Sequence, residues 1–218
     1  MEILFADDAL AVCVKEPGML SQDGGEGSVP DALRRTIGGE AFALHRLDRA
    51  VGGVMLCARS AKAAGDWTRA LTQTGEKQYL AVVAGDPGEE GTYTDLLYHD
   101  PRSNKTFVVQ RMRRGVREAT LRFKRLAAAE YSGTTLSLVR IVLETGRTHQ
   151  IRVQFASRGM PVAGDRRYGS RVQTDSPALW CARVTLLHPE TGARLTFEAK
   201  PQAFPFDLFT DTERGPGD

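Results

Sequence analysis

Two short segments carry acids and bases at positions that could support catalysis. His45-Arg46-Leu47-Asp48 lies about a hundred residues before Gly146-Arg147-Thr148-His149-Gln150-Ile151-Arg152. Each segment places charged or titratable groups on otherwise ordinary scaffold residues. This pattern predicts that folding brings one carboxylate and one guanidinium together to act as an acid, a base or a nucleophile.

Asp48 is the most informative carboxylate. It follows the run from Ala41 to Leu47 and precedes the pair Gly52-Gly53, so a loop at the end of a strand could present it, and such loops often carry catalytic residues. Taken alone, an aspartate flanked by Arg46 and Arg49 fits a surface ion pair better than a catalytic group.

The common cofactor and metal signatures are missing. The sequence has no phosphate-binding loop, dinucleotide turn, nucleophile elbow or zinc helix. The cysteines form no C-x-x-C pair and the histidines are dispersed, so we expect buried thiols, no disulfide, no metal and no organic cofactor. The residues concerned are Cys13, Cys57, Cys181, His45, His99, His149 and His188.

Composition indicates a soluble globular protein. The chain has 218 residues, of which 41% are hydrophobic and 26% charged, and no apolar run reaches the ~20 residues that cross a bilayer. The acidic start argues against a secretory signal or transit peptide. We expect a cytoplasmic monomer with no membrane segment, formed by one domain over residues 1–209 and a flexible tail over residues 210–218.

Basic residues are concentrated in one region. From Pro101 to Arg125 there are nine basic residues and one acid, Glu118. Such a patch could neutralise RNA phosphates, although a charge run can also be a solvated loop. The candidate RNA-backbone contacts are Arg102, Lys105, Arg111, Arg113, Arg114, Arg166 and Arg167, with Arg171 beside the last two.

The elements that must position these residues are mostly strands. Alternating apolar residues predict strands that include Tyr79 to Ala84, Thr134 to Leu143 and Leu179 to Leu187. Ser28 and Ser60 are suitable helix caps, and a third helix is predicted from Thr148 to Arg158. The order predicts an α+β fold with a mixed, largely antiparallel β-sheet core and a few flanking helices.

Four blocks resemble one known family. His45-Arg46-Leu47-Asp48 with Gly53, Lys77 to Val83, Gly146 to Arg152 and Gly164 to Gly169 occur in the order and approximate spacing of the RluA family of pseudouridine synthases. The resemblance runs from Leu4, through an early loop at Lys15 to Gly18, to the region of Phe206. It implies the pseudouridine synthase catalytic fold alone, without the small S4-like RNA-binding domain of many relatives.

The resemblance also implies a reaction and its residues. The enzyme would isomerise particular uridines in a transfer or ribosomal RNA stem-loop to pseudouridine. Asp48 matches the reacting carboxylate and Arg147 its charge partner, whose planar fork suits a bidentate pair. Tyr79 matches the tyrosine that stacks on uracil and takes part in proton transfer; the alternative is a tyrosine of a core strand.

Access to the base requires flipping. A stacked uridine cannot expose C1′ and both ring positions, so the nucleotide must leave the stack. Arg46 occupies the family position beside the flipped base. Ile151 is expected to pack on uracil or in the core, and His45 and His149 are the remaining substrate-binding candidates.

Some positions depart from the family pattern. Val51-Gly52-Gly53 stands where relatives usually have Thr-Ser-Gly, and Trp180-Cys181 stands where they often have His-Ala. Two other classes stay open: a non-catalytic RNA-binding or RNA-folding protein of the same fold, and an unrelated hydrolase using Asp48 with His45 or His149.

Overall fold

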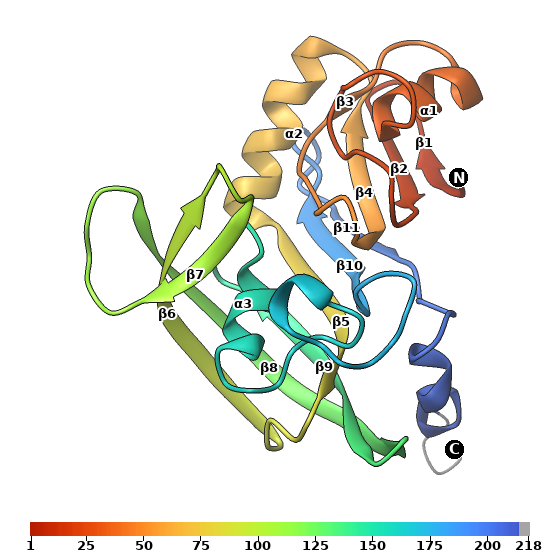
Figure 1. Ribbon diagram of the computed structural model, residues 1–218. Helices are drawn as coiled ribbons and strands as arrows, with labels where there is room; N and C mark the ends of the chain where they lie inside the picture. The colour runs from red at the N-terminus through yellow and green to blue at the C-terminus, as the bar shows by residue number, and fades with distance from the viewer. Residues whose placement is uncertain (214–218) are drawn as a thin grey trace. The chain divides into compact units, whose positions relative to one another are not determined.

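The computed structural model describes residues 1–213, which form two compact units. The first comprises residues 1–78 and 180–201, and the second comprises residues 79–179 and residues from 202 onward. The unit boundaries fall inside two strands, β5 (Glu76–Ala84) and β10 (Leu179–Leu187). Figure 1 traces the elements along the chain.

The first unit is built on a strand order of β1-β2-β4-β10, with β3 also paired to β4 and β11 to β10. Most of these pairs are antiparallel, whereas β10 runs parallel to β4. Its further elements are β1 (Ile3–Ala6), β2 (Leu10–Lys15), α1 (Val29–Ile37), β3 (Phe42–Ala43), β4 (Gly52–Ala58), α2 (Ala61–Thr74) and β11 (Arg194–Glu198).

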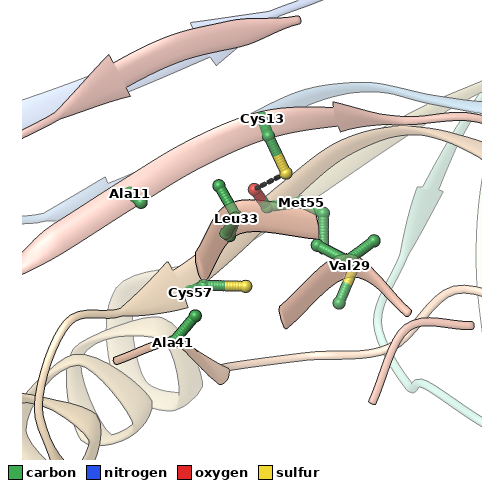
Figure 2. Packing of buried hydrophobic residues seen from close by; sticks show 7 residues of the cluster. All are labelled: Ala11, Cys13, Val29, Leu33, Ala41, Met55 and Cys57. Atoms are coloured by element: carbon green, nitrogen blue, oxygen red, sulfur yellow. Dashed lines mark hydrogen bonds between the residues drawn. The ribbon is translucent and has the colours of Figure 1, made fainter. Parts of the chain in front are cut away.

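Helix α1 covers the face of β2 and β4 that carries alternate small and sulfur-containing residues. Cys13 pairs with Met55 across the two strands, and both lie in one buried cluster with Val29 and Leu33 of α1. Figure 2 shows this packing and the hydrogen bond from Cys13 Sγ to the Met55 carbonyl. Residues two apart on a strand share a face, which explains why Ala11 and Cys13 meet the helix together.

All three cysteines are buried thiols, as predicted. Burial raises the pKa of the Cys13 thiol to about 12. A thiol with so high a pKa is almost entirely protonated near neutral pH and therefore a poor nucleophile.

The second unit has the strand order β5-β9-β8-β6-β7. The pairs β9-β8, β8-β6 and β6-β7 are all antiparallel. Its elements after β5 are β6 (Glu90–Asp100), β7 (Lys105–Val109), β8 (Val116–Tyr131), β9 (Thr134–Leu143), α3 (Gln150–Ala156), the 3-10 helix η1 (Arg166–Tyr168) and the 3-10 helix η2 (Phe206–Glu213).

Aromatic rings join α3 to the sheet of the second unit. Phe155 of α3 meets Phe123 of β8 and Tyr93 of β6 at ring-centroid distances of 5.5 and 5.1 Å. Offset and edge-on contacts at such distances are the favourable arrangement for aromatic pairs. Phe155 lies in the last turn of α3, and Gln150 in its first turn donates to the Thr120 carbonyl of β8, so both ends of the helix contact the sheet.

The predicted α+β fold with a mixed, largely antiparallel sheet is confirmed. Ser28 and Ser60 cap α1 and α2 as expected, by accepting the N–H groups of Asp31 and Ala63. The third helix is shorter than the predicted 148–158, because His149 has a left-handed backbone with φ 55 and the regular turns begin only at Gln150.

The domain prediction is not decided by these observations. Residues 210–213 of the expected flexible tail belong to η2, and residues 214–218 lie outside the described part of the chain. A single catalytic domain over residues 1–209 stays a prediction. Among residues 1–213, none of the helices has the length and apolar character needed to cross a membrane.

Candidate functional site

The loop that carries Asp48 is held through its main chain by a buried lysine. Lys15, at the end of β2, is 0% exposed. Its Nζ donates to the carbonyl oxygens of Val51 at 2.6 Å, Arg49 at 3.1 Å and Asp48 at 3.4 Å. A fourth carbonyl, that of Glu16, lies at 3.2 Å. The ammonium group of Lys15 therefore binds three carbonyl oxygens of the turn that begins at Asp48.

Burial lowers the pKa of Lys15 to about 8, and the neighbouring charges of Asp48 and Glu16 oppose that shift. A cation in this position is expensive to bury unless its N–H groups are all bonded, which the carbonyl cage achieves. From the sequence, the Lys15 segment is recognisable only as an early loop. Nothing in the sequence shows that its side chain reaches the Asp48 turn.

Further backbone contacts fix both ends of this loop. Ser21 Oγ accepts the Leu47 N–H at 2.9 Å and donates to the Leu47 carbonyl at 2.7 Å. Gly18 N–H donates to the Arg49 carbonyl at 2.7 Å, and Arg49 Nε donates to the Gly18 carbonyl at 2.9 Å. The main chain on either side of Asp48 is thus anchored to the segment that follows β2.

His45 has a partner in the scaffold. Its Nε2 accepts the N–H of Leu56 in β4 at 3.2 Å, and its Nδ1 is buried. Burial and the nearby Lys77 lower the pKa of His45 to about 3, so the ring is neutral near pH 7. Arg46, the next residue, is exposed. The geometry therefore gives His45 a bond to β4 and leaves Arg46 at the surface.

The second unit holds Arg147 in a loop that Gln150 organises. Gln150 is 2% exposed, and its Oε1 accepts the Arg147 N–H at 3.0 Å and the Thr145 hydroxyl at 2.9 Å. Its Nε2 donates to the Thr120 carbonyl at 3.1 Å. The Arg147 side chain is exposed and donates from Nε to the Glu118 carbonyl at 3.1 Å.

Tyr79 and Ile151 are buried on regular elements of this unit. Tyr79 is 7% exposed on β5, and Ile151 is 4% exposed in the first turn of α3. The low exposure of both side chains agrees with the interpretation that they pack in the hydrophobic core. It also means that any contact with a base would use only a small part of each side chain.

His149 belongs to a hydrogen-bond network that joins two of the sequence blocks. Its Nδ1 lies 2.9 Å from the hydroxyl of Tyr168, which accepts the Thr106 N–H at 2.9 Å. The Thr106 hydroxyl in turn donates to the Thr148 carbonyl at 2.8 Å. Burial raises the pKa of Tyr168, so its hydroxyl stays protonated. The Thr148 carbonyl is thus tied to β7, and the His149 ring is tied to η1 through Tyr168.

A buried ion pair links the same two blocks. Arg152 Nε lies 2.6 Å from Asp165 Oδ2, and Arg152 Nη2 lies 2.9 Å from Asp165 Oδ1. The two side chains are 6% and 1% exposed. Both residues belong to blocks that the family resemblance quotes, but the sequence does not predict that they meet. Only the fold shows this bidentate pair.

The basic candidates lie on the second unit and are mostly exposed. Arg111, Arg113 and Arg114 occupy the loop between β7 and β8. Exposed apolar groups accompany them, since Phe107 is 41% and Met112 is 62% exposed. The cations also stack on rings, with Lys105 Nζ 5.6 Å from the Phe107 centroid and Arg113 5.1 Å from that of Tyr98.

The second basic group borders the first. Arg167 donates to the carbonyls of Ser103 and Asn104 at 2.9 and 3.2 Å, and Arg166 donates to Gln173 at 2.8 Å. Arg102 and Arg171 are also exposed. In residues 1–213, no group of three or more histidine, cysteine or acidic side chains has the arrangement of a metal site.

The predicted residues are thus distributed over both units. His45, Arg46 and Asp48 belong to the first unit, and the second unit holds the rest. Within the second unit, the structure gathers the Arg147 loop, His149 and the start of α3 around Gln150 and Tyr168. The residues that sequence reasoning missed are those with purely supporting contacts: Lys15, Gln150, Tyr168 and Asp165.

Comparison with known proteins gives a consistent result. The model of the family described as RNA pseudouridylate synthase matches residues 9–157. An uncharacterised RNA pseudouridine synthase of Bacillus subtilis, YhcT, is 32% identical over 95% of this chain and 70% of its own length. The dual-specificity RNA pseudouridine synthase RluA of Escherichia coli is 31% identical over 90% of this chain and 91% of its own.

A comparison of folds gives a similar protein. The structure of human RNA pseudouridylate synthase domain containing 1 superposes with a TM-score of 0.78, covering 100% of this chain and 96% of that one at 19% identity. At that identity, the likeness concerns the fold.

Proposed function

The chain belongs to the RNA pseudouridylate synthase family, and from this we propose that it isomerises specific uridines of a structured transfer or ribosomal RNA, with Asp48 as the reacting carboxylate. The observation that carries the proposal is the matched segment, residues 9–157, which contains Asp48, Tyr79 and Arg147. Each of these residues also matches its motif in the family resemblance.

The reaction needs no external reactant. The bond between ribose C1′ and N1 of uracil breaks, the base turns, and C1′ bonds to C5. N1 gains a proton and C5 loses one, so atoms and electrons balance. A carboxylate at C1′ can attack the sugar or stabilise its positive charge while the base leaves as an anion. This is the role that we assign to Asp48.

The support around Asp48 suits this role. A reacting group must be held near its productive position, and a small misplacement costs much of the rate. Lys15 binds the carbonyls of Asp48, Arg49 and Val51, which restrains the main chain of the loop. The positive charge of Lys15 also favours a nearby negative one.

Arg147 and Tyr79 complete the assignment. The planar guanidinium of Arg147 can stabilise negative charge on the carboxylate or on the departing base. Tyr79 would place its ring against the uracil and its hydroxyl near the proton that moves. Ile151 would supply apolar contact, and His149 would support the loop beside it.

Binding requires the uridine to leave its stack. We assign Arg46, which is exposed, to the space beside the flipped nucleotide. Arg111, Arg113 and Arg114, with the exposed Phe107 and Met112, would contact the surrounding RNA, because cations meet phosphates and aromatic groups meet unpaired bases. A folded stem-loop is the kind of RNA that such a surface selects. We further propose that the enzyme acts as a cytoplasmic monomer without a metal.

Release of tritium from RNA labelled at C5 of uridine tests the function. Wild-type protein is expected to release tritium from transfer or ribosomal RNA, and Asp48→Ala is expected to release none above background. Asp66→Ala, which removes a carboxylate on α2 whose side chain is 47% exposed, is the matched control. Full activity of Asp48→Ala would remove Asp48 from its role. No release by wild type would favour the RNA-binding alternative. Mapping pseudouridine in total RNA with and without the protein identifies the position.

A further inference from the structure

The glycine pair that follows the Asp48 loop lies beside a tryptophan. In the parallel pairing of β4 with β10, Trp180 is the register partner of Gly52 and Cys181 that of Gly53. Both strands belong to the first unit at these positions. Gly52, the last residue of the segment that begins at Asp48, therefore lies beside Trp180.

The Trp180 ring occupies the space that a side chain at residue 52 would need. A Cβ at Gly52 would lie 2.3 Å from Cζ3 and 2.7 Å from Cε3 of that ring, and 3.0 Å from the Lys15 carbonyl oxygen. The indole N–H donates to the Ala199 carbonyl at 2.8 Å. The ring is consequently held in place by the segment that follows β11 and cannot turn away without losing this bond.

Gly53 has a separate requirement. Its φ is 121, which side-chain-bearing residues rarely adopt, and a Cβ there would lie 2.3 Å from the Cys181 carbonyl oxygen. Gly52 has no such backbone restriction, so only the Trp180 ring and the neighbouring main chain demand glycine at residue 52.

Few bonds separate this packing from Asp48. The Val51 carbonyl, next to Gly52, receives the shortest of the Lys15 hydrogen bonds at 2.6 Å. The Val51 N–H donates to the Asp48 carbonyl at 2.9 Å. A shift of Gly52 would move the Val51 peptide, and with it both the Lys15 cage and the turn that begins at Asp48.

We propose that Trp180 is a positioning residue for the reaction: by filling the space at Gly52 it sets the path of residues 48–52 and hence the place of the Asp48 carboxylate. Trp180 itself need not touch the substrate for this role. The proposal rests on the proposed function, since it concerns the carboxylate assigned to that reaction.

Variants of the intact chain that add a side chain at Gly52 or remove the ring of Trp180 test this positioning role. Gly52→Ala adds only the clashing Cβ and is expected to lower kcat by about tenfold or more with little change in KM, because misplacement of a reacting group acts on turnover. Trp180→Ala removes the ring and is expected to lower kcat less. The double variant Gly52→Ala/Trp180→Ala is expected to be more active than Gly52→Ala alone, since the added Cβ then has room.

Gly65→Ala is the matched control. Gly65 lies in α2 and has no positive φ, and a Cβ added there would meet no other atom within 4 Å, so this variant is expected to keep wild-type kcat. Thermal unfolding and circular dichroism of every variant show whether it folds. If Gly52→Ala does not fold, kcat of Trp180→Ala replaces the comparison: a lowered kcat with little change in KM supports the positioning role, and a wild-type kcat overturns it.

The outcomes separate this proposal from the function itself. Wild type could release C5 tritium while the double variant loses kcat by the product of the losses in Gly52→Ala and Trp180→Ala. In that case the positioning role of Trp180 is wrong and the proposed function stands. Unchanged kcat in folded Gly52→Ala, even with lowered thermal stability, would also overturn it, because packing would then matter only for stability. If wild type releases no tritium, both proposals fail.

Discussion

The backbone N–H of Arg147 donates to Oε1 of Gln150 at 3.0 Å, so a side chain three residues later shapes the loop that presents the arginine. The same glutamine binds the Thr120 carbonyl of β8. The loop is therefore tied to the sheet through one buried amide rather than through a run of regular backbone bonds.

Replacing this amide should affect stability and turnover together. Gln150→Met keeps a similar shape and leaves the three bonded groups without their partner, so we expect a loss of about 1–3 kcal/mol in the free energy of unfolding. A displaced Arg147 should also lower kcat, by roughly tenfold or more. Urea unfolding and tritium release measure the two effects. Gln173→Met, at an exposed position, is the control, and an equal response of both variants would contradict the prediction.

The buried pair of Arg152 and Asp165 should be among the most sensitive positions for stability. Asp165→Asn leaves the buried guanidinium without a countercharge, and breaking such a pair typically costs about 3–5 kcal/mol. The same change in Asp66, whose side chain is 47% exposed and lies 3.4 Å from Arg69, should cost under about 1 kcal/mol. Urea unfolding of both variants checks this. Similar losses would show that burial does not control the effect.

Lys15 should make stability depend on pH in the alkaline range. Its pKa is about 8 in the folded protein against an ordinary 10.5, through burial, with Asp48 and Glu16 raising it and Arg49 lowering it. Between these two pH values the unfolded chain holds a proton that the folded protein has lost, so stability gains from this group as pH rises. Relative to Lys15→Met, wild type should gain roughly 3 kcal/mol over that window.

Unfolding by urea at a series of pH values gives the comparison. The difference between wild type and Lys15→Met removes the contribution of every other titrating group that the two share. Parallel stability curves above pH 8 would show that Lys15 keeps an ordinary pKa in its carbonyl cage.

Tyr79 offers a test of chemistry against packing. Tyr79→Phe keeps the ring and removes the hydroxyl, so KM should stay near the wild-type value while kcat falls by about a hundredfold, in the range found for general acid–base groups. Steady-state kinetics on the RNA identified by mapping provides the measurement. Tyr131→Phe, at a position 39% exposed, should be neutral. Wild-type turnover in Tyr79→Phe would leave the residue with a packing role alone.

The exposed loop between β7 and β8 should contribute to RNA affinity through charge. Replacing Arg111, Arg113 and Arg114 with alanine should weaken binding for every RNA sequence and flatten the dependence of log K on log salt by about 2 to 3. Filter binding over a range of salt concentrations measures this slope. A charge-matched triple variant at Lys62, Arg69 and Arg194, which are exposed on the first unit, should keep it. Equal slopes would remove the loop from the interface.

Much of the secondary structure could be predicted because its signals are local. β9 and β10 have the predicted bounds, 134–143 and 179–187, since alternating apolar residues depend only on neighbouring positions. Ser28 and Ser60 cap their helices for the same reason. The third helix was predicted too long because no pattern in the sequence announces the left-handed backbone of His149.

The contacts that support the candidate residues could not be predicted in this way. Lys15 and Val51 are 36 positions apart, and Tyr168 and Thr106 are 62 apart, so their hydrogen bonds depend on which strands become neighbours. In the sequence, Val51-Gly52-Gly53 and Trp180-Cys181 are two separate departures from the family pattern. The register of β4 with β10 places them against each other.

The kind of chemistry can be predicted from the amino-acid sequence, because a family motif consists of residue types in a given order: Asp48, Tyr79 and Arg147 can be named as candidates without coordinates. The contacts that hold each loop in place are visible only in the folded protein. A buried ammonium, a buried amide and an indole ring act through distances of a few ångströms between residues far apart in the chain, and those distances exist only after the sheet has formed.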